Sequence, residues 1–492
     1  MMRPFLLIIA LFFGAQGGII AAPKKQAVDW EKSIVMIEVT RKQYDYIQPW
    51  SRRLAAVEKN GVVLNGKRIL TTAEHFSNQT LIRIQKGGRG KWWTGKLTWV
   101  DYHANLALVT CQDDKFWEQV QPAELAEKIP TKGSASFIRW KDGNFQTQNA
   151  YLEHPTVMPG QLTFAPYLHL APESNIEGAG WAEPLVYNDK LIGITSSQEK
   201  RTLNVIPSPF IRSIFQSVAK GTYSGIGYFD FKWQENVNPA SASSLKLQGE
   251  PRGVVVTKIH KETASKSEIL EKDIILNVDG FDIDAEGDYQ DPVYGHLSFE
   301  NLATRQGWAN TILKVKVWRE GKQLDVNYIL PRADDSQRLV PSDLYDQAPE
   351  YSIYGGLVFQ PLTEPFLKSW GADYMGKAPF RLAYYNQQGP ATDHKALLMM
   401  TMVLPDMYNL GYQDYRFLLL NKVNGVKVSS LIDLKKALQS PQGEFHVIEF
   451  LPGSVPEKIV LDAAGLDQAT QRVLKRYAIP EPSYISTANT AL

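Results

Sequence analysis

The chain has 492 residues, which is too long for one core of ordinary size and predicts two to four domains. Hydrophobic residues make up 44% of the chain and charged residues 21%, a composition that excludes a largely disordered protein. With 53 Lys and Arg against 52 Asp and Glu, the chain has no excess charge to attract nucleic acid or anionic lipid, so neither is expected as a partner.

Residues 1–22 have the pattern of a secretory signal peptide. Arg3 supplies a short basic start, residues 5–14 form an apolar stretch of secretory length, and small residues follow. We therefore expect secretion across the inner membrane, to the periplasm or the extracellular space, with no membrane span after cleavage. An uncleaved membrane anchor is the alternative, although glycines and Gln16 interrupt the apolar stretch.

Between residues 28 and 219 the sequence alternates short apolar runs with turns. Residues 34–39, 81–84 and 106–109 are examples, and this pattern is typical of an all-β barrel or sandwich. Residues 208–219 then predict a helix, because their apolar side chains recur at helical spacing. Cys111 is the only cysteine, so the domains have no internal disulfide and depend on hydrophobic cores.

Two further units follow, from about 223 to 331 and from about 352 to 480. The sequence places a helix at 299–306 in the first unit and at 430–438 in the second. Residues 274–280 (IILNVDG) pair with residues 419–425 (LLNKVNG), which suggests an internal duplication at domain scale. The residues between the two units are polar and predict a linker.

Four short segments resemble the Deg/HtrA family of trypsin-like serine proteases. Residues 69–73 (ILTTA) resemble the strand before the family's catalytic His, and residues 101–108 (DYHANLAL) resemble the segment around its catalytic Asp. Residues 191–194 (LIGI) and 205–208 (VIPS) resemble the strands and the helix entry after its nucleophile. All four occur in the family's order and precede the two further units, which look like PDZ domains.

The similarity is closest to the plant-type Deg branch with tandem PDZ domains and covers nearly the whole mature chain. It implies a mainly β fold, in which a trypsin-like double β-barrel is followed by two PDZ-like α+β domains. The domains expected from it are a signal peptide at 1–22, a trypsin-like domain at 23–220, a first PDZ domain at 221–335, a linker at 336–350 and a second PDZ-like domain at 351–482.

The same alignment puts different residues at all three positions of the family's catalytic triad. The His position is Glu74, with His75 one place later, and the Asp position is Asn105. The nucleophile position is Trp181, which has no nucleophilic atom. On a strand, alternation would point His75 away from the site, and a slip of one residue that brings it in is the alternative. We expect Glu74, Asn105 and Trp181 to converge between the barrels, with no catalytic residue among them.

The resemblance also implies a damaged oxyanion hole, because Ala179 and the Ala182–Glu183 pair replace glycines of the family's loop. The Trp181 indole either fills the vacated site by packing or anchors a bound peptide. No cofactor and no metal are expected, since the remaining histidines show no metal-ligand spacing. These histidines are His103, His154, His169, His260, His296, His394 and His446.

The PDZ-like units indicate peptide binding. A PDZ domain adds a peptide strand to its sheet edge, and a glycine-containing loop receives the C-terminal carboxylate on backbone N–H groups. Ile226, Gly227 and Tyr228 resemble that loop in the first unit. In the second unit, the corresponding residues are Gly355, Gly356 and Leu357. The alternative is that these loops pack one domain against another.

The sequence thus predicts a secreted Deg/HtrA-like protein without proteolytic activity. It would bind unfolded segments or C-termini of other proteins through its PDZ domains and act as a scaffold, chaperone or regulator. The alternative is an active serine-type endopeptidase of the same family in protein quality control, with a site that the alignment misplaces. Self-assembly and co-assembly with an active relative both stay open.

Overall fold

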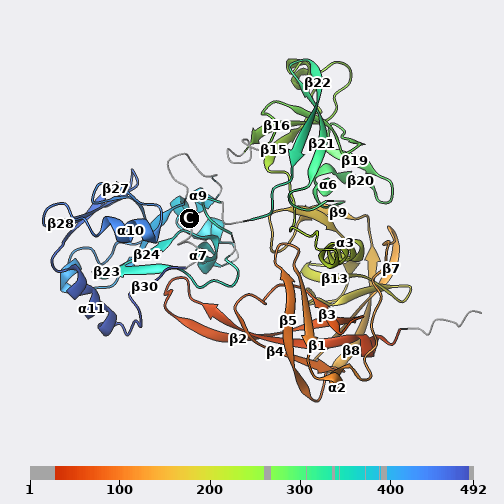
Figure 1. The fold of residues 1–492 in the computed structure, drawn as a ribbon, viewed down its shortest axis with the longest axis horizontal. Helices are drawn as coiled ribbons and strands as arrows, with labels where there is room; N and C mark the ends of the chain where they lie inside the picture. Colours follow the sequence, from red (N-terminus) through yellow and green to blue (C-terminus); the bar gives the residue numbers. More distant parts are fainter. Residues whose placement is uncertain are drawn as a thin grey trace, which may run out of the picture.

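The computed structural model describes residues 28–259, 267–305, 307–334, 338–342, 344–371, 373–386, 388 and 396–486. The predicted signal peptide, His260 and His394 lie outside these residues. Two β-barrels are followed by two α+β units (Figure 1). The predicted fold class, mainly β with a double barrel, is confirmed. No helix in the described part of the chain is both long and apolar enough to cross a bilayer.

The first barrel closes six antiparallel strands in the order β1-β2-β3-β6-β5-β4. The strands are β1 (Ile34–Tyr44), β2 (Arg52–Leu64), β3 (Arg68–Thr71), β4 (Gln79–Lys86), β5 (Trp92–Asp101) and β6 (Leu106–Cys111), with short helices α1 (Trp30–Ser33) and α2 (Asp114–Trp117). Val35, Ile37 and Val39 alternate along β1 and pack into the core of this barrel.

The second barrel closes six strands in the order β11-β14-β13-β12-β7-β8. The strands are β7 (Gly133–Lys141), β8 (Asn144–Leu152), β11 (Glu173–Ser174), β12 (Pro184–Tyr187), β13 (Lys190–Glu199) and β14 (Thr202–Pro207), and a separate pair is β9 (Thr156–Pro159) with β10 (Pro166–His169). Helix α3 (Ser208–Ala219) follows, with the bounds that the sequence predicts.

The two barrels pack directly against each other. Ile34 and Met36 lie on the face of β1 that points away from its own core, and they form a buried cluster with Ile138, Trp140 and Val186 of the second barrel. β1 is therefore apolar on both faces at its start, because one face fills a barrel and the other forms the interface.

The middle unit is an antiparallel sheet in the order β15-β16-β17-β21-β22, with β18 paired to β17. Its elements are β15 (Phe231–Glu235), α4 (Pro239–Ser244), β16 (Val254–Ile259), β17 (Ile274–Val278), β18 (Phe281–Asp282), β19 (Asp288–Asp291), β20 (Gly295–Ser298), η1 (Phe299–Asn301), α6 (Leu302–Arg305), β21 (Ile312–Arg319) and β22 (Lys322–Ile329). Along β21, Leu313, Val315 and Val317 are buried while Lys314 and Lys316 are exposed, the alternation of a half-buried strand.

The C-terminal unit is a larger sheet in the order β29-β28-β26-β25-β24-β23-β30, with β27 paired to β26. Its elements are β23 (Tyr351–Tyr354), β24 (Leu357–Pro361), α7 (Glu364–Leu367), η3 (Lys368–Trp370), α8 (Tyr374–Lys377), α9 (Phe380–Asn386), β25 (Leu398–Val403), η4 (Met407–Asn409), β26 (Leu418–Val423), β27 (Val426–Lys427), α10 (Leu431–Ala437), β28 (Phe445–Phe450), β29 (Lys458–Asp462), α11 (Leu466–Arg476) and β30 (Ser483–Tyr484). The helices between β24 and β25 were not predicted from the sequence.

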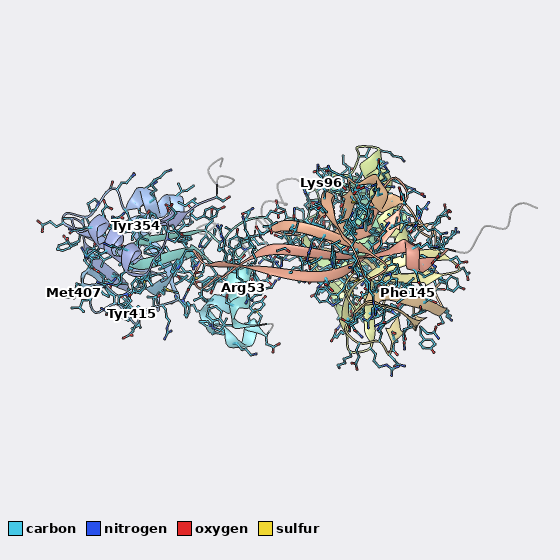
Figure 2. The ribbon with its side chains drawn as sticks, turned by 90° about the horizontal axis from the view of Figure 1, so that it is seen from below. Arg53, Lys96, Phe145, Tyr354, Met407 and Tyr415 are labelled. Carbon is cyan, nitrogen blue, oxygen red and sulfur yellow. The ribbon has the colours of Figure 1, made fainter. Side chains whose placement is uncertain are left out.

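The β1–β2 hairpin extends beyond the first barrel. β1 pairs with β2 as far as Tyr44↔Arg52, whereas β4 follows β1 only to the pair Arg41↔Gln79. We call residues 42–53 the arm. Figure 2 shows these strands running between the barrels and the C-terminal unit, with Arg53 labelled on them.

The tip of the arm packs on the C-terminal unit. Tyr46 and Ile47 join a hydrophobic cluster around Leu362, and Trp50 meets Tyr351 edge to face with ring centroids 5.9 Å apart. The barrels and the C-terminal unit are thus joined by packing as well as by the chain.

The segment predicted as a linker is docked in its described part. Leu339 and Val340 are buried in the cluster that the arm tip joins. Tyr345 stacks on Tyr102 of the first barrel, with ring centroids 4.0 Å apart, and Asp346 accepts a hydrogen bond of 2.7 Å from the Tyr102 hydroxyl. This connection holds the C-terminal unit close to the first barrel instead of acting as a free spacer.

Candidate functional site

Glu74 and Asn105 are neighbours in the first barrel. The backbone N–H of Glu74 donates to Asn105 Oδ1 over 3.0 Å. Asn105 is fully buried and has a φ of 51°, a left-handed conformation that Asn tolerates better than most residues. Burial raises the pKa of the Glu74 carboxyl, and the nearby Lys59 ammonium opposes that shift.

His75 faces the site. Its ring centroid lies 5.5 Å from that of Trp181, and its Nε2 lies 3.5 Å from Glu74 Oε1. The prediction that His75 points away is wrong because β3 ends at Thr71, and His75 lies in the turn that follows with a φ of 71°. Burial, together with the positive charge of Arg41, lowers the pKa of His75 to about 4, so the ring is neutral at pH 7.

Lys59 belongs to this site, although sequence reasoning did not identify it. It is 1% exposed, and its ammonium donates to Thr72 O (2.8 Å), Thr72 Oγ1 (2.6 Å) and Glu74 O (2.9 Å). These bonds can use all three N–H groups and hold the turn that carries Glu74 and His75. Burial lowers the pKa of Lys59 to about 7. The signal in the sequence was a lysine inside the apolar half of a strand.

Glu183 holds the loop at the predicted nucleophile position. It is 1% exposed, and its Oε2 accepts hydrogen bonds from the backbone N–H groups of Gly180 (3.0 Å) and Trp181 (2.7 Å). The Thr195 hydroxyl donates to the same oxygen, and Arg139 Nη1 lies 3.9 Å from Oε1. Gly180 has a φ of 110°, and a Cβ there would lie 2.8 Å from the backbone of β13, so the loop requires glycine at this position.

The oxyanion hole of a trypsin-like enzyme uses the N–H of the nucleophile and the N–H two residues before it. In the predicted register these groups belong to Trp181 and Ala179. The Trp181 N–H donates to Glu183, and the Ala179 N–H donates to Gln198 Oε1 over 2.9 Å. Both groups therefore already have an acceptor within the chain.

Trp181 lies at the rim of the site with an exposed fraction of 36%. Its carbonyl accepts a hydrogen bond of 2.7 Å from the Asn60 N–H. Asn60 Oδ1 in turn accepts from the Trp140 N–H in the second barrel over 3.0 Å. Asn60 of the first barrel is thus hydrogen-bonded both to the loop and to the second barrel. The Trp181 ring lies beside the His75 ring.

The first predicted carboxylate loop has internal partners. Ile226 is 1% exposed and packs with the core of the barrels, and its carbonyl accepts from the Ala333 N–H over 2.8 Å. Gly227 forms a bridge with Arg332, and the Tyr228 N–H donates to the Pro331 carbonyl over 3.4 Å. These contacts join the segment to the end of the same unit.

The second predicted loop is a tight turn. Gly355 and Gly356 connect β23 to β24, with φ values of 58° and 91°. Both are buried. The Gly355 N–H donates to Thr470 Oγ1 over 2.8 Å, and Asn409 Nδ2 donates to the Gly355 carbonyl over 2.8 Å. Leu357 is fully buried in the core of the unit.

Across the described part of the chain, no group of three or more His, Cys, Asp and Glu side chains could hold a metal ion.

Comparison with known proteins identifies relatives over most of the chain. A family described as "PDZ domain" matches residues 340–484. "Protease Do-like 4, mitochondrial" of Arabidopsis thaliana is 24% identical over 459 residues, which is 91% of this chain and 84% of the relative. "Protease Do-like 2, chloroplastic" of the same plant is 22% identical, and the alignment covers 91% of this chain and 74% of the length of that relative.

Among solved structures, "HtrA-type protease AlgW with decapeptide" aligns with 61% of this chain and 95% of its own, with 15% identity and a TM-score of 0.45. At 22–24% identity, the sequence comparisons show that the chain is similar to plant proteases over most of its length. Its particular relatives are named Do-like proteases, and its C-terminal part carries a PDZ domain.

We predict that His75→Asn flattens the acid dependence of stability. Between pH 6.5 and about 4 the unfolded chain binds a proton at His75 that the folded chain does not, so the wild type loses stability as the pH falls through this window. The full effect is about 3 kcal/mol at most. Asn keeps the positive φ, and thermal unfolding at pH 7.5, 5.5 and 4 measures the difference.

The exposed His154 supplies the control, and His154→Asn should follow the wild type at every pH. Parallel curves for His75→Asn and the wild type would contradict the assignment of a neutral, half-buried His75.

We predict that Gly356→Ala destabilises the C-terminal unit by about 1–3 kcal/mol. A Cβ there would overlap Asn409 Nδ2 and the Leu404 carbonyl, and the φ of 91° strains any L residue. Gly376→Ala is the matched control, since it lies in α8 with open space around it and should be neutral or stabilising. Equal thermal midpoints for the two variants would rule out the described packing of this turn.

Proposed function

We propose that this Deg/HtrA-like protein has no proteolytic activity and binds unfolded segments of other proteins as a scaffold, chaperone or regulator. One observation carries the proposal: the Trp181 and Ala179 N–H groups are already hydrogen-bonded to Glu183 and Gln198. A substrate carbonyl would have to displace a buried carboxylate to reach the first of them. Leaving that carboxylate unpartnered costs free energy that a peptide carbonyl does not return.

The neighbouring hydroxyl groups are also engaged. Thr195 Oγ1 donates to Glu183, and Ser196 Oγ donates to the Asn204 carbonyl over 3.2 Å. Ser197 Oγ accepts from Asn204 Nδ2 over 2.8 Å. Among the described residues, the hydrogen bonds of Ser196 and Ser197 go to Asn204 and not to His75, so no observation favours the active endopeptidase over the binding protein.

For binding, the contacts favour extended segments over free C-termini. The two predicted loops, Ile226–Tyr228 and Gly355–Leu357, make internal hydrogen bonds in the structure. The edge of the C-terminal sheet at β23 is paired with β30 of the same chain. Both loops remain predictions as peptide sites, and the PDZ match at 340–484 supports peptide binding by this part of the chain.

We propose export of the protein on the basis of its N-terminal sequence. The apolar stretch at 5–14 supports secretion across the inner membrane, whereas the relatives carry the words mitochondrial and chloroplastic in their names. Fractionation of the source cells with a C-terminal tag distinguishes export from import into an organelle.

We predict that the purified chain does not hydrolyse casein and is not labelled by serine-directed phosphonates, because no nucleophile stands at Trp181. Trp181→Ser alone should not create activity, since Glu183 still occupies the loop N–H. Trypsin under the same conditions is the positive control for both assays. Hydrolysis that is lost in Ser196→Ala or Ser197→Ala would show an active site elsewhere in the second barrel.

We predict that the chain suppresses aggregation of a chemically denatured client at near-stoichiometric ratios. Calorimetry should give micromolar affinities, about 8 kcal/mol, for an extended peptide of that client. Free-acid and C-terminally amidated forms should bind equally, because the Tyr228 and Gly355 N–H groups already have acceptors within the chain. A large loss on amidation would mean that one of the loops opens to capture a carboxylate.

A further inference from the structure

A cavity of about 1000 Å³ lies beside the degenerate triad. Four parts of the chain form it: the arm, the turn with Glu74 and His75, the docked connection at Tyr345, and the C-terminal unit at Pro365 and Lys368. The volume is at the upper end of the range for small-molecule pockets. No single domain creates this space, since the arm and the connection bring the C-terminal unit up to the first barrel.

The walls of the cavity are basic. Five positively charged side chains line it against two carboxylates. The positive residues are Arg41, Lys42, Arg52, Arg53 and Lys368. Arg52 and Arg53 are exposed on the arm. Lys368 lies 3.3 Å from Glu364, which offsets part of its charge. Because the chain as a whole is nearly neutral, this concentration of charge is local.

The two carboxylates of the cavity, Asp45 and Glu74, already have neighbours within the chain. Asp45 Oδ1 accepts hydrogen bonds from the backbone N–H groups of Ile47 (2.8 Å) and Gln48 (3.1 Å). The Glu74 carboxylate lies 3.5 Å from His75 Nε2, and burial raises its pKa. In contrast, Arg41 Nε is buried without a hydrogen-bond partner among the described residues. A buried guanidinium N–H without an acceptor is costly, and an anionic ligand would supply the acceptor.

A main-chain edge opens toward the same space. Gln43 and Tyr44 pair with β2 on one side. On the other side the cover ends at Lys42, whose N–H donates to the Asn78 carbonyl over 3.0 Å, and within the described chain no strand pairs with Gln43 and Tyr44 there. Ser77 and Asn78, which precede β4, line the cavity, so it lies on the unpaired side of β1. An unpaired strand edge is a template for an extended peptide.

We propose that this cavity binds an extended acidic peptide segment, which adds to the free edge of β1 and places its carboxylates against the basic residues of the arm. The proposal extends the peptide-binding function above by naming the site and the chemistry of its ligand, and it does not depend on the lack of proteolysis. Small polyanions such as phosphates would satisfy the charges but not the strand edge, so a peptide fits the walls better.

The test measures binding of short peptides to the full chain by fluorescence anisotropy. The probe is a labelled hexapeptide of alternating Asp and Val, about 20 Å long when extended and blocked at both ends. Blocking removes the free C-terminus, so capture by a PDZ carboxylate loop cannot contribute. We expect a micromolar Kd for this peptide and at least tenfold weaker binding of the matching Asn and Val peptide. Raising the salt concentration should weaken binding of the acidic peptide only.

Reversing the charge of two arm residues tests whether the peptide binds in this cavity. The double variant Arg52→Glu with Arg53→Glu should lose at least tenfold in affinity. A double variant with the same charge change, Lys96→Glu with Lys314→Glu, is the control, since both lysines are exposed and neither lines the cavity. Figure 2 labels Lys96 on the barrels, away from the arm. The control should bind within twofold of the wild type.

Three results would overturn the proposal: equal binding of the acidic and neutral peptides, unchanged affinity in the arm variant, or binding of tripolyphosphate without binding of the peptide. If circular dichroism shows that the arm variant is unfolded, the peptide series on the wild type decides alone. Suppression of client aggregation without binding of the acidic peptide would remove this site and leave the proposed function standing.

Discussion

A buried carboxylate sets the conformation of the loop on which the site depends. Glu183 and Arg139 are almost fully inaccessible, and Arg139 also donates to the carbonyls of Glu177 and Gly178 over 3.2 and 3.1 Å. Removing one partner of such a pair leaves a charge in a low-dielectric interior, which costs several kcal/mol. The loop is therefore stabilised in the conformation in which its N–H groups face Glu183 and not a ligand.

The opposite wall of the site is held by a second buried charge. Lys59 bonds to the turn at Thr72 and Glu74, and that turn determines where Glu74 and His75 lie. A catalytic base of a serine protease must take a proton from the nucleophile, and here a neutral His75 meets an indole instead. The buried groups that hold the turn at His75 and the loop at Trp181 are thus hydrogen-bonded within the chain.

The arm and the docked connection both join the first barrel to the C-terminal unit. Trp50 and Tyr345 anchor at opposite ends of the same contact, one on the C-terminal unit and one on the first barrel. The cavity of about 1000 Å³ lies between these two parts of the chain. Within the described part of the chain, that space has a buried Arg41 Nε without a hydrogen-bond partner and a strand edge at Gln43 and Tyr44 that no strand covers on one side.

Local pattern was enough for strands β1, β4 and β6 and for helix α3, because alternation and helical spacing are properties of neighbouring residues. The order of four short motifs was enough to align Glu74, Asn105 and Trp181 with the three catalytic-triad positions of the family. Sequence reasoning failed at His75, since it assumed that a strand continues where β3 has already ended. It also could not indicate that Leu339 and Val340 of the linker are buried.

What the sequence determined by itself was part of the set of elements, including strand β1 and helix α3, and the absence of a nucleophilic atom at Trp181. Only the tertiary structure decided which buried polar groups form hydrogen bonds with one another. The acceptors of the loop N–H groups, Glu183 and Gln198, depend on how β13 approaches the loop. The basic cavity depends on residues more than 300 positions apart, such as Arg41 and Lys368, which no local pattern relates. Periodicity encodes which face of an element is buried, whereas the partner of a buried polar group is set by packing between distant elements.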